Sequence, residues 1–152
     1  MLQQPRKHLA YQRRSWCPRF IAPSRILLQL ASPNQGNYFK IMQENRRALE
    51  LAHDSRGRRF ELLELPSPIV SERFGFERYC DCYANYILVN GAVIATAFGV
   101  AEDDAAHKAF SLAFPGRQVE LQPVPTISIG GGSLHCSTQQ QPATTGQLPA
   151  NI

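Results

Sequence analysis

Apolar side chains recur with two different periods along this chain, and the change of period predicts its elements. Residues 26–30 and 60–65 are short apolar runs of strand length. Between them, residues 38–52 place apolar side chains at helical spacing and charged side chains on the other faces, which is typical of an amphipathic helix. The first part of the chain is therefore predicted to run strand, helix, strand.

A similar order is predicted to return further along the chain. A hairpin is predicted from strands at residues 83–89 and 92–98, followed by a helix at residues 102–113. Two short strands follow, at residues 119–121 and 126–129. Asn90-Gly91 between the first two strands is a strong hairpin signal, and Glu102 lies at the positive end of the predicted helix dipole. The two successive sets look like a weak internal repeat of a β-β-α-β unit, without obvious sequence identity between them.

Composition indicates one soluble globular domain. The chain has 152 residues, of which 43% are hydrophobic and 18% charged. No apolar run approaches the roughly 18 residues that cross a bilayer, so no membrane contact is expected. Residues 1–43 hold seven Lys or Arg and no acid, whereas residues 44–152 hold nine Lys or Arg against twelve acids. Because the basic excess is confined to one end, no nucleic-acid partner is expected.

Composition also divides the chain into three segments. Residues 1–20 form an Arg-rich lead that is not expected to belong to the fold, residues 21–142 form the folded domain, and residues 143–152 form a polar tail that is expected to be disordered. The lead has the composition of an organellar transit peptide. A start site left by truncation or rearrangement is the favoured alternative.

The four cysteines, Cys17, Cys80, Cys82 and Cys136, do not have the spacing of a disulfide framework. Cys80-Asp81-Cys82 could present two sulfurs to a metal from one face of a strand, but no second pair of His or Cys completes a zinc pattern. These two cysteines are predicted to be structural and no metal is expected. A reducing cytoplasm is the default location.

The glycine–cysteine segment near the carboxyl end holds the most distinctive chemistry. Gly130, Gly131 and Gly132 let the backbone come close to a ligand because no Cβ intervenes. His135 and Cys136 follow among small hydroxyl and amide side chains, an environment in which a thiolate could act as a nucleophile. A glycine turn followed by a buried, inert cysteine is the other interpretation of this pattern.

Two longer segments carry a family resemblance. They are residues 83–94, YANYILVNGAVI, and residues 130–140, GGGSLHCSTQQ, with shorter matches at residues 42–45, 98–99 and 114–117. Across residues 20–142 the chain resembles the agmatine deiminase family, which includes the bacterial peptidylarginine deiminases. The resemblance implies a pentein fold, an α/β propeller of five β-β-α-β units around a central active site. This chain would form about two of the five units.

The reaction that the resemblance implies is hydrolysis of a guanidinium. Agmatine and water would give N-carbamoylputrescine and ammonia, a step of putrescine biosynthesis, without a metal or organic cofactor. By motif match Cys136 would attack the guanidinium carbon, and the backbone of Gly130, Gly131 and Gly132 would line the substrate pocket. The planar guanidinium also needs carboxylates to accept its N–H groups, and the departing ammonia needs a general acid.

The acid/base pattern of the family is not found at the expected place. Members carry His-x-Asp a few residues before an Arg-Phe pair, and alignment on Arg19-Phe20 puts Arg13 at the His position and Ser15 at the Asp position. His8 is the nearest other base and is five residues out of register. His135 is expected to support the site from behind, because neighbours on a strand point to opposite faces.

Two functions therefore remain open. The chain is either the nucleophile-bearing end of an agmatine deiminase-type hydrolase, or a catalytically inactive remnant or binding module; the isolated chain is expected to be inactive. Action on peptidyl arginine is the alternative within the family. Besides the guanidinium substrate, uncovered strand edges favour association with a complementary fragment or with further copies of the chain, or aggregation.

Overall fold

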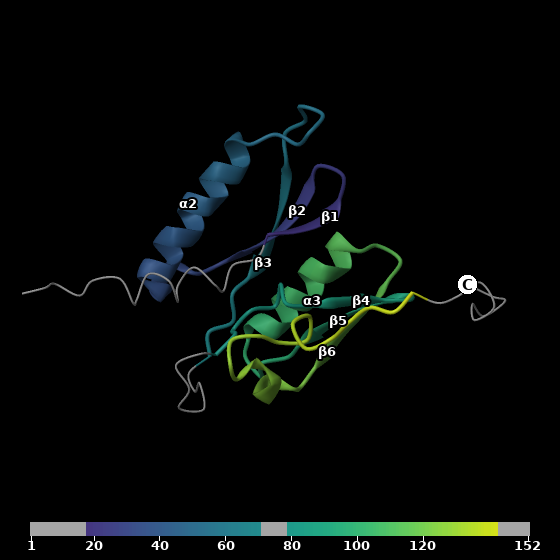
Figure 1. Ribbon diagram of the computed structural model, residues 1–152. Helices are drawn as coiled ribbons and strands as arrows, with labels where there is room; N and C mark the ends of the chain where they lie inside the picture. Colours follow the sequence, from purple (N-terminus) through teal and green to yellow (C-terminus); the bar gives the residue numbers. More distant parts are fainter. Residues whose placement is uncertain (1–17, 71–78, 143–152) are drawn as a thin grey trace, which may run out of the picture.

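Two successive units with the same order of elements make up the described part of the chain. The computed structural model describes residues 18–70 and 79–142, and Figure 1 shows their arrangement. The first unit holds β1 (Arg19–Ala22), β2 (Arg25–Leu30), a 3-10 turn (Pro33–Gln35), α2 (Asn37–Leu51) and β3 (Glu61–Pro66). The second unit holds β4 (Ile87–Val89), β5 (Ala92–Thr96), α3 (Glu102–Ala113), β6 (Gln118–Gln122) and a 3-10 turn (Pro125–Ser128).

Strand pairing is the same in both units. β1 is antiparallel to β2, which is parallel to β3, and β4 is antiparallel to β5, which is parallel to β6. A helix makes the crossover between the parallel strands of each unit, as parallel pairing requires. The predicted hairpin pairs Val89 with Ala92, and Gly91 in its turn has a φ of 75°, which glycine tolerates. The predicted α/β class and the predicted β-β-α-β repeat are confirmed for the described residues.

The core of the second unit is built on α3. Its buried side chains are Ala106, Ala109, Phe110 and Ala113, whereas Ala105 is exposed. Tyr86 packs edge-on against Phe110 and Phe114, with ring centroids 5.2 and 5.4 Å apart. Figure 1 shows α3 beside β3, so this helix also covers part of the first sheet.

A buried glutamine joins the two units. Gln29 lies in β2 with 1% of its surface exposed. Its Nε2 donates to the Ser67 hydroxyl at 3.3 Å and to the Asp81 carbonyl at 3.1 Å, and its Oε1 accepts the Ala84 N–H at 3.3 Å. Because donor and acceptor are both satisfied, the buried amide is tolerated. It fixes the loop that leads into β4 to the middle strand of the first sheet.

Three details of the fold differ from the sequence predictions. β1 begins at Arg19, so Arg19 and Phe20 belong to the fold and not to the lead that is predicted to end at residue 20. The strand predicted at residues 126–129 is wrong, because Pro125 begins a 3-10 turn there and Ile129 forms a single bridge with Tyr79. The first hairpin strand is shorter than predicted, because residues 83–84 form a turn.

Residues 1–17 and 143–152, which hold most of the predicted lead and the predicted tail, lie outside the described residues. None of the helices in residues 18–70 and 79–142 is long and apolar enough to cross a membrane.

Candidate functional site

The glycine–cysteine segment ends in a single helical turn. The Ser137 N–H donates to the Ser133 carbonyl at 3.1 Å, and the Thr138 hydroxyl donates to the Leu134 carbonyl at 2.8 Å. Residues 133–138, the cysteine turn, present Cys136 as an exposed thiol. The interpretation of Cys136 as a buried cysteine is therefore wrong. The alternation of strand faces, which is the stated reason for placing His135 behind the site, does not apply to a turn.

Asn85 holds the cysteine turn through its side-chain amide. Its Oδ1 accepts the N–H of His135 at 2.9 Å and the N–H of Cys136 at 3.3 Å. Its Nδ2 donates to the Cys136 Sγ at 3.2 Å. One amide thus orients both the backbone and the sulfur of Cys136. The role of Asn85 was not predicted from the sequence, where it appears only within the matched segment 83–94. No local pattern connects Asn85 with Cys136, which is distant from it in the chain.

The three glycines before the turn serve two different needs. Gly130 and Gly131 have φ values of 100° and 92°, a backbone conformation that other residues rarely adopt. At Gly132 the constraint is space, because a Cβ there would lie 2.8 Å from the Cys136 Cβ and 3.4 Å from its Sγ. Of the three glycines, Gly132 therefore lies directly against Cys136.

Buried hydroxyl groups anchor the start of the cysteine turn. The Thr96 Oγ1 and the Ser133 Oγ lie 2.7 Å apart, and the Ser128 hydroxyl donates to the Ser133 Oγ at 3.3 Å. All three side chains are at most 1% exposed. Thr96 ends β5, so this network attaches the turn to the central strand of the second sheet. It was not predicted, because hydroxyl side chains so far apart in the sequence carry no signal of contact.

A positive charge lies near the cysteine turn. The guanidinium carbon of Arg19 is 4.8 Å from the centroid of the Tyr86 ring, which is a cation–π distance. Partial burial, together with the Arg19 charge, holds the pKa of His135 below its ordinary value of 6.5. A His135 that is neutral at neutral pH can hydrogen-bond but does not supply an imidazolium beside Cys136.

A second pair of thiols lies beneath Asn85. Cys80 and Cys82 are 6% and 3% exposed, and the Asn85 Nδ2 is 3.9 Å from the Cys80 Sγ. A hydrogen bond from the Cys82 side chain lowers the pKa of Cys80 despite its burial. Among the described residues, no group of three or more His, Cys, Asp or Glu side chains could hold a metal ion.

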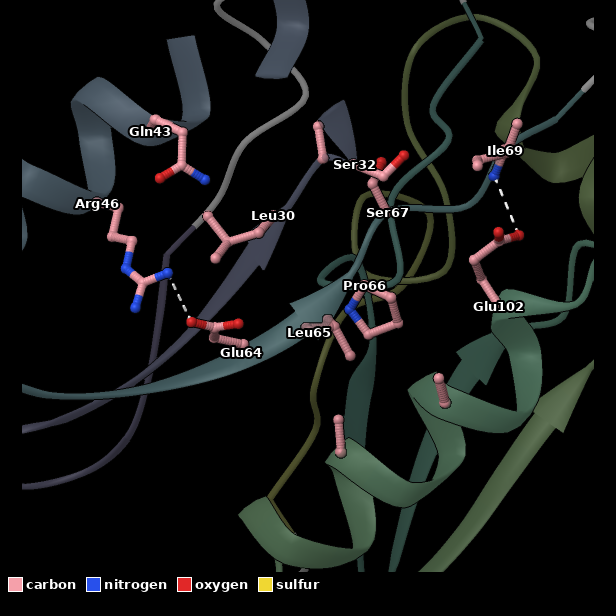
Figure 2. Close-up of a pocket in the computed structure, with 13 residues that line it drawn as sticks. Leu30, Ser32, Gln43, Arg46, Glu64, Leu65, Pro66, Ser67, Ile69 and Glu102 are labelled. Carbon is pink, nitrogen blue, oxygen red and sulfur yellow. Dashed lines mark hydrogen bonds and ion pairs between the residues drawn. The ribbon is translucent and has the colours of Figure 1, made fainter. Parts of the chain in front are cut away.

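A cavity of about 450 Å³ lies elsewhere, between α2, the end of β3 and the start of α3. Figure 2 shows that its charged groups have protein partners. The Arg46 guanidinium is 2.7 Å from the Glu64 carboxylate, and the Glu102 carboxylate accepts the Ile69 N–H at 3.4 Å. The residues that line this cavity do not include the glycines or the cysteine turn, so it is separate from Cys136.

Comparison with known proteins identifies the family. The family model described as Porphyromonas-type peptidyl-arginine deiminase matches residues 16–142 of this chain. The chain belongs to this deiminase family. The predicted resemblance to agmatine deiminases and bacterial peptidylarginine deiminases is confirmed, over nearly the predicted extent.

Relatives of this deiminase chain include proteins named as agmatine deiminases. The agmatine deiminase of Ectopseudomonas mendocina is 28% identical, with 93% of this chain and 47% of the relative covered. The solved agmatine deiminase of C. jejuni is 26% identical, with a TM-score of 0.64 over 80% of this chain and 35% of that one. The solved agmatine deiminase of Enterococcus faecalis has a TM-score of 0.71 over 81% of this chain and 38% of that one; at 22% identity it supports the fold alone.

The deiminase chain spans between 27% and 47% of the lengths of the curated relatives that it matches. Arg13 and Ser15, which stand where the family's His-x-Asp is expected, lie outside the described residues, as do His8 and Cys17. The described part of the candidate site therefore comprises Cys136, the glycine run, His135 and the residues that hold them.

Proposed function

We propose that this chain is the nucleophile-bearing part of an agmatine deiminase-type hydrolase. The observation that carries the proposal is the Asn85 amide, which donates to the Cys136 Sγ at 3.2 Å while it holds the backbone of the same residue. An exposed, oriented thiol is what nucleophilic attack on a planar cation requires, and Gly132 leaves room directly beside this one. Relatives named as agmatine deiminases indicate agmatine as the substrate.

The proposed reaction proceeds in two displacements. The Cys136 Sγ adds to the central guanidinium carbon of agmatine, and ammonia leaves once it has received a proton. Water then adds to the carbon that is bound to sulfur, and the Sγ departs to leave N-carbamoylputrescine. Backbone of Gly130, Gly131 and Gly132 forms the wall beside the sulfur, and His135 supports the turn as a neutral group. The residues named here require no metal or organic cofactor for these steps.

The 152 residues alone are proposed to lack turnover. Arg13 and Ser15 offer neither a general acid nor a guanidinium-binding carboxylate where family members carry His and Asp. We propose that the chain forms about two of five β-β-α-β units of a pentein and completes its site with a complementary fragment or a further copy of itself, in the cytoplasm. A catalytically inactive remnant or binding module is the alternative.

A chimera separates these possibilities. The carboxyl-terminal part of the Ectopseudomonas mendocina agmatine deiminase would be replaced, from its Arg-Phe pair onward, by this chain from Arg19 onward. Ammonia release from agmatine is expected for the chimera and absent from its Cys136→Ala variant, whereas the isolated chain is expected to release none. A folded chimera without activity would contradict the proposed role of Cys136.

Peptidyl arginine is the second candidate substrate, because the matching family model is described by that activity. The same chimera would be offered agmatine and a short peptide with an internal arginine in competition. Faster ammonia release from the peptide would replace agmatine as the proposed substrate.

A further inference from the structure

One amide nitrogen contacts both an exposed and a buried sulfur in this structure. The Asn85 Nδ2 is 3.2 Å from the Cys136 Sγ and 3.9 Å from the Cys80 Sγ. Cys136 is exposed, while Cys80 is buried directly behind the amide. Because both sulfurs contact the same nitrogen, they lie at most about 7 Å apart, and a rearrangement of the exposed cysteine turn could bring them together.

We propose that Cys136 is a site of reversible oxidation by hydroperoxides and that Cys80 is its resolving cysteine. This inference rests on the nucleophilic Cys136 of the proposed function, but it requires no substrate and none of the missing acid/base residues. Its chemical partner is a small hydroperoxide such as hydrogen peroxide, which reaches an exposed thiol and not a buried one.

The chemistry balances over two steps. The Cys136 thiolate attacks one oxygen of hydrogen peroxide, the O–O bond breaks, and sulfenic acid and hydroxide form; sulfur is oxidised and the peroxide is reduced. The Cys80 sulfur then attacks the Cys136 sulfur, a disulfide forms, and the sulfenic oxygen leaves as water with the remaining proton. An external dithiol reduces the disulfide and restores both thiols.

The backbone determines which sulfur moves. The Cys80 N–H is held by the Ser128 carbonyl at 2.9 Å, within the buried layer beneath the turn. Cys136 lies in an exposed turn that follows Gly130 and Gly131, and glycine restricts the backbone φ and ψ torsions less than other residues do. A disulfide needs the sulfurs about 2 Å apart, so the cysteine turn is expected to move inward as the Asn85 Nδ2 moves aside.

Cys82 supports this assignment in a different role. The hydrogen bond from its side chain lowers the pKa of Cys80 and so favours the thiolate, which is the form of the thiol that attacks. The consequence of the reaction is protection. A disulfide withdraws Cys136 from water before further peroxide converts it to sulfinic acid, which simple thiols do not reverse.

Peroxide treatment of the reduced 152-residue chain tests the proposal. After a small molar excess of hydrogen peroxide, free thiols are alkylated and tryptic peptides are sequenced by fragmentation mass spectrometry, which separates Cys80 from Cys82. The expected result is a Cys80–Cys136 disulfide that dithiothreitol removes. Cys80→Ser is expected to lose this cross-link and to accumulate sulfinic and sulfonic acid at Cys136, whereas the matched variant Cys82→Ser keeps the cross-link and forms it more slowly.

A disulfide from Cys136 to Cys17 or Cys82, or equal irreversible oxidation of Cys136 with and without Cys80, would overturn the proposal. Far-ultraviolet circular dichroism before oxidation shows whether each variant is folded. The chimera assay for ammonia is independent of this readout. A Cys80–Cys136 cross-link in the absence of ammonia release supports the oxidation site and contradicts only the proposed hydrolase, and the converse result overturns only the oxidation site.

Discussion

Gly132 lies so close to Cys136 that a Cβ on the glycine would be 2.8 Å from the Cβ of the cysteine. Real Cβ atoms do not approach a neighbour this closely, so one of the two segments would have to shift. The relationship explains why a glycine is needed at a position whose φ is not in the left-handed region. It also makes the position of the sulfur sensitive to one methyl group.

Gly132→Ala is therefore expected to displace Cys136 and to slow its alkylation by iodoacetamide several-fold, at a cost of about 1–3 kcal/mol in unfolding free energy from overpacking. The rate is measured at Cys136 by peptide mass spectrometry. Gly57→Ala is the matched control, because Gly57 has open space around its Cβ position and its substitution introduces only backbone strain. An unchanged alkylation rate in Gly132→Ala would show that the close approach does not position the sulfur.

Substitutions of Asn85 separate its acceptor from its donor. Asn85→Asp keeps an oxygen for the N–H groups of His135 and Cys136 but loses the N–H that faces the Cys136 Sγ, whereas Asn85→Ala loses both. Asn85→Ala is expected to lose about 1–3 kcal/mol of unfolding free energy and to speed hydrogen exchange at the Cys136 amide, whereas the His135 amide keeps the Asn85 backbone carbonyl as an acceptor at 3.2 Å. Asn85→Asp is expected to retain the protection of these amides and to change only the reactivity of Cys136. Equal exchange at the Cys136 amide in the two variants would contradict the division of roles.

The buried hydroxyl network predicts a difference between two conservative substitutions at Thr96. Thr96→Val keeps the shape but leaves the Ser133 hydroxyl with one partner fewer, and is expected to lower the unfolding free energy by about 1–2 kcal/mol. Thr96→Ser retains the hydroxyl and is expected to lose less, through one methyl group. Urea denaturation monitored by circular dichroism gives both values. Valine as stable as threonine would show that the network does not stabilise the turn.

The titration of His135 is expected to lie below pH 6.5, with burial as the larger cause and the Arg19 charge as the smaller. Because the unfolded histidine then binds more protons than the folded one, its contribution to stability is complete above about pH 6.5 and declines as the pH falls toward the folded pKa. NMR titration of the His135 ring measures the pKa directly. Arg19→Met should raise it, while Arg25→Met, which removes a charge paired with Glu61, should leave it unchanged. A midpoint at or above 6.5 in the unsubstituted chain would refute the expectation.

Periodicity and turn chemistry were sufficient for much of the fold. The helix at residues 102–113 and the Asn90-Gly91 hairpin could be predicted because each is encoded by neighbouring residues. The strand predicted at residues 126–129 failed because Pro125 favours the start of a 3-10 turn over the apolar signal that follows it. No strand was predicted at β1, because Arg19-Phe20 has the composition of the basic segment before it.

The site was predictable only where its chemistry is local. Cys136 and the glycine run stand together in the sequence, so their association could be anticipated. Asn85 and Thr96 are far from the cysteine turn in the sequence but contact it in the fold. Patterns among neighbouring residues of one sequence do not predict contacts between such distant residues. Their roles become visible only in the folded chain, where the loop before β4 and the end of β5 both contact the cysteine turn.

The buried amide of Gln29 makes the site in the second unit depend on the first unit. It fixes the backbone of Ala84, the residue before Asn85, and Asn85 in turn orients the sulfur of Cys136. The position of the Cys136 Sγ therefore depends, through these two hydrogen bonds, on the central strand of the first unit. A change at position 29 is therefore expected to alter the position of the sulfur without touching the glycine run, and the second unit transplanted by itself is expected to hold its thiol less firmly.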